Sequence, residues 1–362
     1  MVSICCVSDS HLGYRHRLKL QRLRDYEKAF VDSMNKVIEL KPELFILGGD
    51  IFHYPRPDPR SMYIFLKKIL EIADSTEIVI CIGNHEIEGH LGTAYAPIFS
   101  ELHKNINVLT TDNPHINLKI DGEEIGVHGF QYIRDRKVAE ETLIDISNEV
   151  DENCHNILCI HQGIEKYIDP FEISIKTLRD ISNKYDLILS GHLHKHQRIE
   201  EVFDITPAFY IGSTERISFN EWNNKNGFLV FREFEFNNPE FIEIKSADMG
   251  VIRKILGKKT PSEINSYIDT IIRENIDKKC LQIVIEAEIR GDYLDILQDW
   301  ELRYPEFTIL DVNVIPKTYE TDVEFTGIEI NRRLLEEYFE KTGLKDRKDL
   351  MELCIRLYER YS

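Results

Sequence analysis

The residues best suited to chemistry are histidine, aspartate and asparagine side chains that follow short apolar runs. The first run, Ile4–Val7, is followed by Asp9-Ser10-His11. Because alternate residues of an extended chain point to the same side, Asp9 and His11 can approach one point in space. A single Asp-x-His pair is weak evidence, since an aspartate in a turn beside a surface histidine gives the same pattern.

The same arrangement recurs four more times: Glu43–Leu47 precedes Gly48-Gly49-Asp50 and His53, Glu77–Ile82 precedes Gly83-Asn84-His85-Glu86, Asn156–Ile160 precedes His161, and Asp186–Ser190 precedes Gly191-His192-Leu193-His194. In a parallel or mixed sheet the carboxyl ends of neighbouring strands meet along one crevice. The recurrence therefore predicts that these polar side chains converge on one site.

Pooled, the side chains form a set of oxygen and nitrogen donors without a thiolate: Asp9, His11, Asp50, Asn84, His161, His192 and His194. Such a set suits manganese, iron or zinc better than an iron–sulfur cluster. Seven ligands are too many for one ion but suit two, and Asp50, after two glycines that allow close approach, is the expected bridge. Two divalent ions about 3.5–4 Å apart polarise a phosphate and lower the pKa of a water molecule, which then attacks phosphorus in line.

A histidine that is not a ligand is the usual proton donor to the leaving oxygen. His85 is the expected donor, because it neighbours the ligand Asn84 but points elsewhere along the strand end. His53 is expected to steady the charge of the phosphate. A ligand or a simple turn residue is the alternative for His85.

Other histidines near the motifs have simpler explanations. His16, His90 and His196 are expected to lie in solvated loops. The run from His85-Glu86 to His90 resembles a zinc-protease motif, but its spacing is one residue too long for one face of a helix. That interpretation therefore fails.

Helical spacing separates the first strand-like runs. Apolar residues recur every three or four positions over Leu18–Leu40 and again over Pro59–Ala73, which predicts two amphipathic helices. Strands that alternate with helices predict an α/β domain over residues 1–236, with a largely parallel or mixed sheet.

A smaller α/β unit is predicted over residues 240–315, with strands near Phe241–Ile244, Val251–Leu256, Cys280–Ile289 and Phe307–Val314 and helices over Pro261–Glu274 and Asp292–Arg303. Residues 316–327 are polar and lack apolar periodicity, which predicts a linker. Residues 328–362 predict two amphipathic helices. A helical hairpin beyond a linker has little of its own chain to bury against, so docking on a partner competes with folding back on the body.

Charge and cysteine content restrict the classes of function. The 362 residues carry a net charge of −18, so any nucleic-acid surface must be a local basic patch on an acidic body. No apolar stretch approaches the length of a membrane span, and no association with membranes is expected. The seven cysteines are scattered, and several lie inside apolar strands, which favours a cytoplasmic protein over a secreted one.

The motifs resemble those of the calcineurin-like metallophosphoesterase superfamily: Asp9-x-His11, Gly49-Asp50, Gly83-Asn84-His85-Glu86, His161 and Gly191-His192-x-His194 occur in the expected order. Within it the chain is similar to DNA double-strand-break repair nucleases of the meiotic-recombination-eleven or SbcD type, and its compact length fits an archaeal member. The closer similarity lies in Ser8–Gly13, Gly48–His53, Ile160–Gly163 and Gly212–Arg216. Glu86 is a departure, because many nuclease members carry aspartate there and phosphoprotein phosphatases favour glutamate.

The resemblance implies a mixed β-sheet sandwich flanked by helices, a small α/β capping domain and a C-terminal helical hairpin. It assigns one metal to Asp9, His11, Asp50 and His194 and the other to Asp50, Asn84, His161 and His192, with His85 as proton donor and His53 on the phosphate. The implied cofactor is two Mn²⁺ per chain, with Mg²⁺, Fe²⁺ or Zn²⁺ also compatible.

The same resemblance implies a function and partners. The implied activities are 3′-to-5′ exonuclease on double-stranded DNA and single-strand endonuclease, used to process double-strand breaks at the nucleoid. The implied partners are a second copy of the chain, as a homodimer, and a coiled-coil ABC-type ATPase of the Rad-fifty/SbcC kind. The C-terminal hairpin matches the ATPase-binding segment in position and character.

Tyr14 and the basic residues beside the first two motifs are the candidates for DNA contact: Arg15 and Arg17, followed by Lys19, Arg22 and Arg24, and then Arg56 and Arg60. Contacts to the DNA backbone need only such a local patch. Ordinary charged helix faces carry the same residue types, and that alternative stays open for each residue.

Two other functions stay open on the same motifs. A phosphomonoesterase or phosphoprotein phosphatase uses the same fold, but such phosphatases place a substrate-clamping arginine in the second motif, where this chain has Ile51-Phe52-His53. A non-catalytic scaffold is the other alternative. It is disfavoured because every ligand position is filled.

Overall fold

The computed structural model describes residues 2–89, 93–151 and 153–317. A first compact unit ends at Ile315, and Pro316–Ser362 is the second. The predicted linker beyond Lys317, the predicted helical hairpin at 328–362 and His90 all lie outside the described residues.

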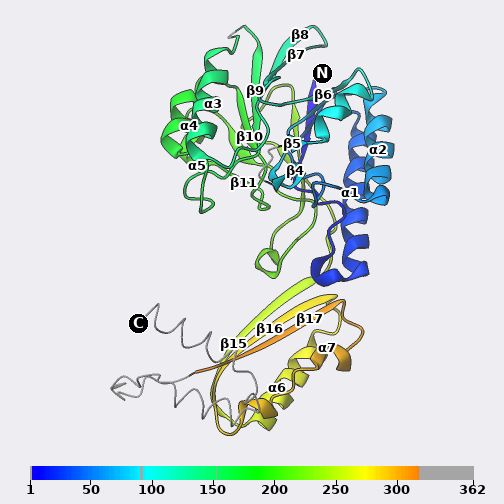
Figure 1. The fold of residues 1–362 in the computed structure, drawn as a ribbon, viewed down its shortest axis with the longest axis vertical. Coiled ribbons are helices and arrows are strands. Elements are labelled where there is room, and N and C mark those ends of the chain that lie inside the picture. Colours follow the sequence, from blue (N-terminus) through cyan, green and yellow to red (C-terminus); the bar gives the residue numbers. More distant parts are fainter. Residues whose placement is uncertain (1, 90–92, 152, 318–362) are drawn as a thin grey trace, which may run out of the picture. The chain divides into compact units, whose positions relative to one another are not determined.

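Two mixed six-stranded sheets form most of the first unit (Figure 1). The first sheet has the order β14 (Glu240–Glu243), β13 (Gly227–Arg232), β1 (Ser3–Val7), β2 (Leu44–Leu47), β3 (Glu77–Ile80) and β6 (Ile106–Val108). The second has the order β11 (Gln197–Arg198), β12 (Ala208–Tyr210), β10 (Leu187–Ser190), β9 (His155–Ile160), β8 (Glu123–His128) and β7 (His115–Ile120). The inner strands are mostly parallel, and antiparallel strands close one edge of the first sheet and both edges of the second, whereas β6 pairs in parallel with β3, so the expected mixed sandwich is confirmed.

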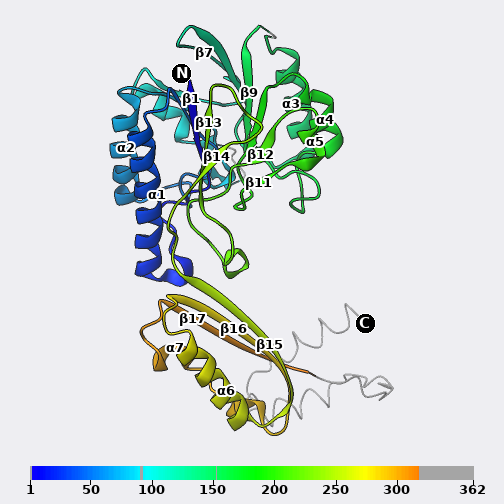
Figure 2. The ribbon, with the colours of Figure 1, turned by 180° about the vertical axis from the view of Figure 1, so that it is seen from behind.

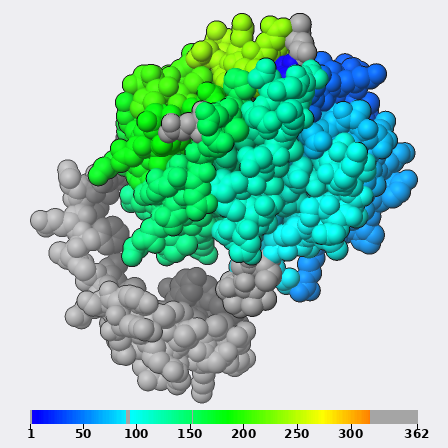
Figure 3. Space-filling model, turned by 90° about the horizontal axis from the view of Figure 1, so that it is seen from above, coloured from blue at the N-terminus to red at the C-terminus, as the bar shows by residue number. Residues whose placement is uncertain are grey.

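Helices cover the outer face of each sheet, and both views of the ribbon show them on opposite sides (Figures 1 and 2). The first sheet is covered by α1 (Leu20–Leu40) and α2 (Pro59–Ala73), and the second by α3 (Arg136–Asn148), α4 (Ile175–Ser182) and α5 (Glu200–Phe203). Seen from above, the blue and green surfaces of these two groups flank the teal residues between them (Figure 3).

Three buried clusters hold the four layers together, and β1 shows how one strand serves two of them. Cys5 and Val7 pack with residues of α1 and α2, whereas Ile4 and Cys6 pack with residues of the second sheet. Because successive side chains point to opposite faces, a strand covered on both faces must be apolar throughout. This explains why the runs before the motifs are continuously apolar.

The predicted helices of this region are confirmed with one change. Asp58 caps α2 by accepting hydrogen bonds from the backbone amides of Arg60 and Ser61, which fixes its start at Pro59 as predicted. The helix expected from Leu18 begins instead at Leu20, because Arg17 and Leu18 adopt left-handed conformations with φ of 51° and 60°.

The smaller sheet consists of β15 (Met249–Lys259), β16 (Cys280–Ile289) and β17 (Ile309–Pro316), covered by α6 (Pro261–Glu274). The strand expected near Phe241–Ile244 does not belong to it. That strand is β14, which pairs with β13 at the edge of the first sheet. The smaller sheet therefore begins only at Met249.

The continuous helix predicted over Asp292–Arg303 is wrong. The segment contains a short 3₁₀ turn, η6 (Tyr293–Asp295), and a single helical turn, α7 (Trp300–Arg303). Between them Asn265 of α6 accepts a hydrogen bond from the amide of Leu297 and donates one to the carbonyl of Asp295. These side-chain bonds fix the backbone in an extended form that apolar spacing does not reveal.

Among the described helices, none combines the length and apolar character needed to cross a membrane.

Arg22 was grouped with the surface basic residues, but its side chain is fully buried in α1. Its guanidinium donates to the carbonyl of Arg216 at 2.7 Å and lies 3.4 Å from the carboxylate of Glu215. Arg22 therefore stabilises the fold and is not available to DNA.

We expect Arg22→Met to lower the free energy of unfolding by about 3–5 kcal/mol, because it leaves the buried carboxylate of Glu215 without its cation. Urea denaturation of the purified chain measures the change. Arg24→Met, on an exposed position of the same helix, is the matched control and should stay within about 0.5 kcal/mol of the wild type. Equal stability of the two variants would contradict a structural role for Arg22.

Candidate metal centre

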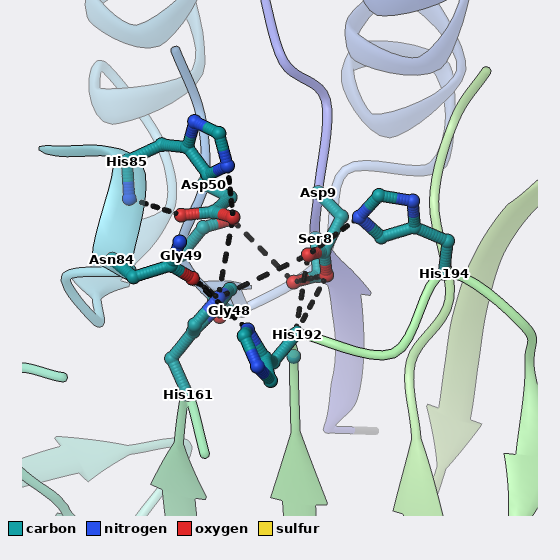
Figure 4. A network of polar contacts seen from close by, with 12 residues as sticks. Ser8, Asp9, Gly48, Gly49, Asp50, Asn84, His85, His161, His192 and His194 are labelled. Carbon is teal, nitrogen blue, oxygen red and sulfur yellow. Dashed lines mark hydrogen bonds and ion pairs between the residues drawn. The ribbon is translucent and has the colours of Figure 1, made fainter. Parts of the chain in front are cut away.

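The ends of five strands bring the predicted motif residues together (Figure 4). Asp9 follows β1, Asp50 follows β2 and Asn84 follows β3 in the first sheet, whereas His161 follows β9 and His192 and His194 follow β10 in the second. Hydrogen bonds from the amide of Asp9 to the carbonyl of Gly49 and from the amide of His11 to the carbonyl of Asp50, both 3.0 Å, hold the ends of β1 and β2 in register. The site thus lies where the carboxyl ends of both sheets meet.

The first donor cluster consists of Asp9, His11 and His194. The Nε2 atoms of His11 and His194 are 3.0 Å apart, and the Nε2 atom of His194 lies 3.6 Å from Oδ1 of Asp9. Two donors that each lie about 2.1 Å from one ion are roughly 3.0–3.4 Å apart. The 3.0 Å spacing lies within this range and the 3.6 Å spacing slightly above it, so the cluster is compatible with a single metal ion.

The second cluster consists of Asp50, His161 and His192, with Asn84 beside them. The Oδ1 atom of Asn84 lies 3.2 Å from Nε2 of His161 and 2.9 Å from Nδ1 of His192. Oδ2 of Asp50 lies 3.4 Å from Nε2 of His161 and 3.7 Å from Nε2 of His11, which belongs to the first cluster. Asp50 therefore stands between the clusters, as expected of a bridging carboxylate.

Hydrogen bonds on the far side of two rings orient them toward the clusters. Nδ1 of His161 donates to the carbonyl of Gly48 at 2.8 Å, and Nδ1 of His194 bonds to Oε1 of Glu221 at 3.0 Å. A ring whose Nδ1 carries the proton presents Nε2 as the metal-binding atom. Both Nε2 atoms face the donor clusters.

Four candidate ligands adopt left-handed backbone conformations: φ is 51° at Asp9, 45° at His11, 49° at Asp50 and 77° at His192. Such values are uncommon for residues with a side chain and cost free energy unless the surroundings enforce them. These four residues lie at the ends of neighbouring strands, so backbone strain is concentrated at the candidate metal centre.

Electrostatics set Asp50 apart from an ordinary buried acid. Asp9 and Asp50 are 1% and 2% exposed. Their ion-pair partners among the described residues are histidines, not lysines or arginines. Burial acts to raise the pKa of Asp50, but the charge of His161 and its hydrogen bond lower this pKa below its ordinary value.

The pKa values of the histidines depend on how strongly each interacts with a carboxylate. Burial opposes the charge of His161, yet Asp50 raises the pKa of His161 to about 10. Burial also opposes the charge of His194, while Glu221 and Asp9 raise its pKa above the ordinary value. Burial lowers the pKa of His192 to about 3. Because buried carboxylates need compensating positive charge, two divalent ions fit this donor set.

His85 and His53 lie beside the clusters, as predicted. Nδ1 of His85 donates to the carbonyl of His53 at 2.7 Å, and its Nε2 lies 3.9 Å from Oδ2 of Asp50. Nδ1 of His53 is 3.2 Å from Nδ1 of His11, and its ring packs on Tyr14 with centroids 3.8 Å apart. Nitrogens of His11, His53 and His85 also lie within 4.8 Å of one another, so distance alone does not separate a proton donor from a ligand.

Two other histidines differ from expectation. His16 is buried, and its ring stacks on Tyr14. His196 is half-buried, bonds to the carbonyl of Tyr210 and stacks on Phe241. Neither is the solvated loop residue that we expected.

Three of the candidate DNA-contact arginines form ion pairs with carboxylates of this chain. Arg17 pairs with Asp311 at 2.7 Å, Arg56 with Glu88 at 2.5 Å and Arg60 with Glu27 at 2.5 Å. Arg15 is exposed and, unlike these three arginines, forms no ion pair with a described carboxylate, although its charge helps to lower the pKa of Asp58.

Sequence reasoning noted Glu86 only as a departure and missed its role. Its carboxylate is buried and accepts hydrogen bonds from the amides of Asp50 and Gly83 through Oε2 and from Phe52 through Oε1. It therefore joins the ends of β2 and β3 behind the second cluster. The position of Glu86 directly after the candidate ligand Asn84 and His85 could have indicated this role from the sequence.

A cavity of about 1230 Å³ opens beside Asn84 and His192 and was also missed. Tyr132, Arg134 and Phe171 contribute to its walls. Tyr132 donates to Glu172 at 3.0 Å, and its ring lies 5.7 Å from that of His192. The sequence gives little sign of it, because the residues that directly follow β8 (Glu123–His128) are Gly129 and Phe130, neither of which is a metal ligand.

Comparison with known proteins places this architecture. The family model for calcineurin-like phosphoesterases matches residues 2–196, which contain both donor clusters. The chain belongs to the calcineurin-like phosphoesterase family. Residues that follow the match complete the family domain in the structure, since β12 and β13 pair with strands inside it.

The phosphoesterase is similar to archaeal proteins along most of its length. It is 27% identical to the DNA double-strand break repair protein Mre11 of Methanocaldococcus jannaschii, over 98% of this chain and 93% of that protein. It is 22% identical to the DNA double-strand break repair protein Mre11 of Archaeoglobus fulgidus, over 98% of this chain and 79% of that protein.

Manganese uptake by the phosphoesterase should release protons. Metal ions bind neutral imidazole, but Asp50 keeps His161 protonated at neutral pH because its pKa is raised to about 10. We expect about one to two protons released per chain, and an affinity that rises from about pH 6 to pH 8 because protons and metal compete for the same nitrogens. Calorimetric titration with MnCl₂ in two buffers of different ionisation enthalpy measures the release. Identical heats in both buffers would rule it out.

Gly83→Ala should weaken manganese binding by at least about tenfold. A Cβ atom at Gly83 meets Oδ1 and the amide nitrogen of Asp50 at 2.2 and 2.4 Å, so the bridging carboxylate must move. Equilibrium dialysis with MnCl₂ measures the effect. Gly257→Ala is the matched control, because a Cβ atom there meets nothing within 4 Å. Unchanged affinity in Gly83→Ala would argue against Asp50 as a ligand.

Proposed function

We propose that this phosphoesterase is a two-metal DNA nuclease that processes double-strand breaks. The observation that carries the proposal is the pair of donor clusters on either side of Asp50, with His85 beside them. Similarity to proteins named DNA double-strand break repair protein Mre11, over nearly the full chain, supports DNA as the substrate. The proposed activities are 3′-to-5′ exonuclease on duplex DNA and endonuclease on single strands, with Mn²⁺ as the metal.

We assign one metal to Asp9, His11, Asp50 and His194 and the other to Asp50, Asn84, His161 and His192. When bound, such a pair polarises a phosphodiester and lowers the pKa of a water molecule. The chain itself orients the bridging carboxylate. The backbone amide of His85 donates a hydrogen bond to Oδ1 of Asp50, and the backbone amide of Asp50 donates one to Oε2 of Glu86.

His85 is suited to hand a proton to the leaving oxygen. Its Nδ1 is committed to the carbonyl of His53, so the proton that it transfers must reside on Nε2. The ring is 31% exposed, which leaves it within reach of a substrate. His53, held between Tyr14 and His85, faces the same space and is proposed to contact the phosphate.

DNA approaches along the basic residues that follow the first two motifs. We propose backbone contacts for Tyr14, Arg15, Arg17, Arg56 and Arg60. Arg15 is held in no ion pair with a described carboxylate, whereas Arg17, Arg56 and Arg60 must exchange a carboxylate for a phosphate. The exposed Arg56–Glu88 pair contributes little stability, so its exchange is inexpensive. The Arg60–Glu27 pair is more costly to break, because the side chain of Glu27 is only 9% exposed.

We also propose a homodimer and a coiled-coil ABC-type ATPase as partners. The apolar spacing of residues 328–362, which lie outside the described part, supports the second: Leu334, Leu335, Tyr338 and Phe339 share one helical face in the predicted hairpin. Double-strand-break processing with these partners places the protein at the nucleoid.

His85→Leu should abolish most DNA cleavage while metal binding persists. Loss of a general acid costs a factor of about 10²–10⁴ in rate. The assay follows nucleotide release from linear duplex DNA labelled at either the 3′ or the 5′ end, with Mn²⁺ or EDTA, and metal content is measured in parallel. His155→Leu is the matched control, because His155 is similarly exposed at 38% but stacks on Phe234 away from the clusters.

The outcomes separate the candidate functions. Manganese-dependent release that fails only in His85→Leu supports the nuclease and its proton donor. A wild-type chain that leaves DNA intact but hydrolyses a phosphomonoester would establish the phosphatase instead. A wild-type chain that takes up no divalent metal would establish the scaffold.

A further inference from the structure

Segment 213–221, between β12 and β13, holds His194 at two points. The amide of Ser213 donates to the carbonyl of His194 at 3.1 Å, and Oε1 of Glu221 bonds to Nδ1 of the same histidine at 3.0 Å. The backbone and the ring of one candidate ligand thus depend on the two ends of one short segment.

The side chain of Glu221 is held in place by hydrogen bonds and is largely buried. Its second oxygen, Oε2, accepts a hydrogen bond from the amide of Ile217 at 2.9 Å. It ends the 3₁₀ turn η5 (Phe219–Glu221), and its side chain is 16% exposed. Because one oxygen is used by its own segment, the other has a fixed direction, toward His194.

The same segment carries a contact with the smaller α/β domain. Phe219 is 6% exposed and forms a buried cluster with Met249 of β15, Cys280 of β16 and Ile309 of β17. Each of these three residues is the first of its strand. Phe219 therefore sits against one end of the whole small sheet, two residues before Glu221.

Polar contacts tie the segment to the chain that enters the small sheet. Glu215 accepts a hydrogen bond from the amide of Ala247 at 2.9 Å, and Arg216 donates to the carbonyl of Ala247 at 3.0 Å. The carbonyl of Arg216 in turn accepts hydrogen bonds from the buried Arg22 and from Tyr26 of α1, both at 2.7 Å. The segment is thus fixed between α1 and the start of β15.

We propose that Glu221 is a positioning residue for the metal bound by His194, and that segment 213–221 makes the affinity of that metal depend on the packing of the small α/β domain against Phe219. The proposal rests on the two-metal centre proposed above. Carboxylates that orient a ligating imidazole typically change metal affinity by about 10–100-fold when they are removed. In the other cluster the ring of His161 is held differently, because its Nδ1 donates to the carbonyl of Gly48 inside the sandwich.

The test is manganese binding by the full chain, measured by calorimetry and by electron paramagnetic resonance, with no assay of cleavage. Wild type should bind two Mn²⁺. In Glu221→Gln the amide cannot accept from both His194 and Ile217, so one of the two sites should weaken by about 10–100-fold and the other should not change. At one equivalent of metal this variant should then show the spectrum of an isolated Mn²⁺.

Two controls define the affected site and exclude a general effect of charge. His194→Gln should weaken the same binding event as Glu221→Gln. Glu235→Gln, an exposed carboxylate outside the site, should bind like wild type. Equal binding of both metals by Glu221→Gln and wild type overturns the positioning role.

A substitution within the small domain tests whether the packing of this domain affects metal affinity. Met249→Ala touches no candidate ligand but removes the contact with Phe219, and should weaken the same site by roughly fivefold or more. Its effect should not add to that of Glu221→Gln, since both act through one segment. Ile272→Ala, in the separate core of the small domain, is the matched control and should leave both sites unchanged.

If Met249→Ala binds both metals like wild type, the coupling is overturned. Melting curves of the metal-free variants separate a change in metal affinity from a change in stability. Met249→Ala and Ile272→Ala should both destabilise the small domain, but only Met249→Ala is expected to weaken manganese binding. Two bound Mn²⁺ without any cleavage of DNA would refute the proposed nuclease and leave this inference standing.

Discussion

Two buried carboxylates, Asp9 and Asp50, are the constraint on which the rest of the structure depends. Both come from the first sheet, and the histidines nearest to them include His161 and His194 from the second. A buried carboxylate is costly unless positive charge or hydrogen bonds compensate it. The two sheets must therefore meet at this edge, because the histidines of the second sheet compensate the buried carboxylates of the first. The packing of the sandwich and the formation of the metal centre depend on each other.

The strain at the strand ends follows from that arrangement. Asp9, His11, Asp50 and His192 turn with positive φ because their side chains must leave the strand direction and point into one small volume. Unfavourable backbone of this kind costs of the order of 1–3 kcal/mol per residue. The continuously apolar strands behind the site, buried on both faces, supply the rigidity that enforces it. Glu86 adds a local brace by gathering three backbone amides of two strand ends.

The sequence predicted the site better than it predicted several elements. Candidate ligands such as Asp9 and His161 were recognisable because they follow strong apolar strands, whose side-chain period is local. Burial of Arg22 depends on Arg216, 194 positions away, and the pairing of β14 with β13 joins residues 10 to 16 positions apart, which periodicity within either segment does not connect. The helix expected over Asp292–Arg303 failed for the same reason, since Asn265 of α6 intervenes. Glu221 carried no motif at all. Its meaning appears only when His194 is placed beside it.

The two donor clusters differ in what supports them, and this asymmetry has a consequence for the whole molecule. His161 is fixed by a backbone carbonyl between buried strands, so its place is as rigid as the sandwich. His194 is fixed by a side chain on a connecting segment whose neighbour Phe219 packs on another domain. Rigid sheets transmit little between domains, whereas a segment held from two sides responds to either. Any partner that displaces the small domain therefore acts first on the cluster of His194, while the cluster of His161 stays intact.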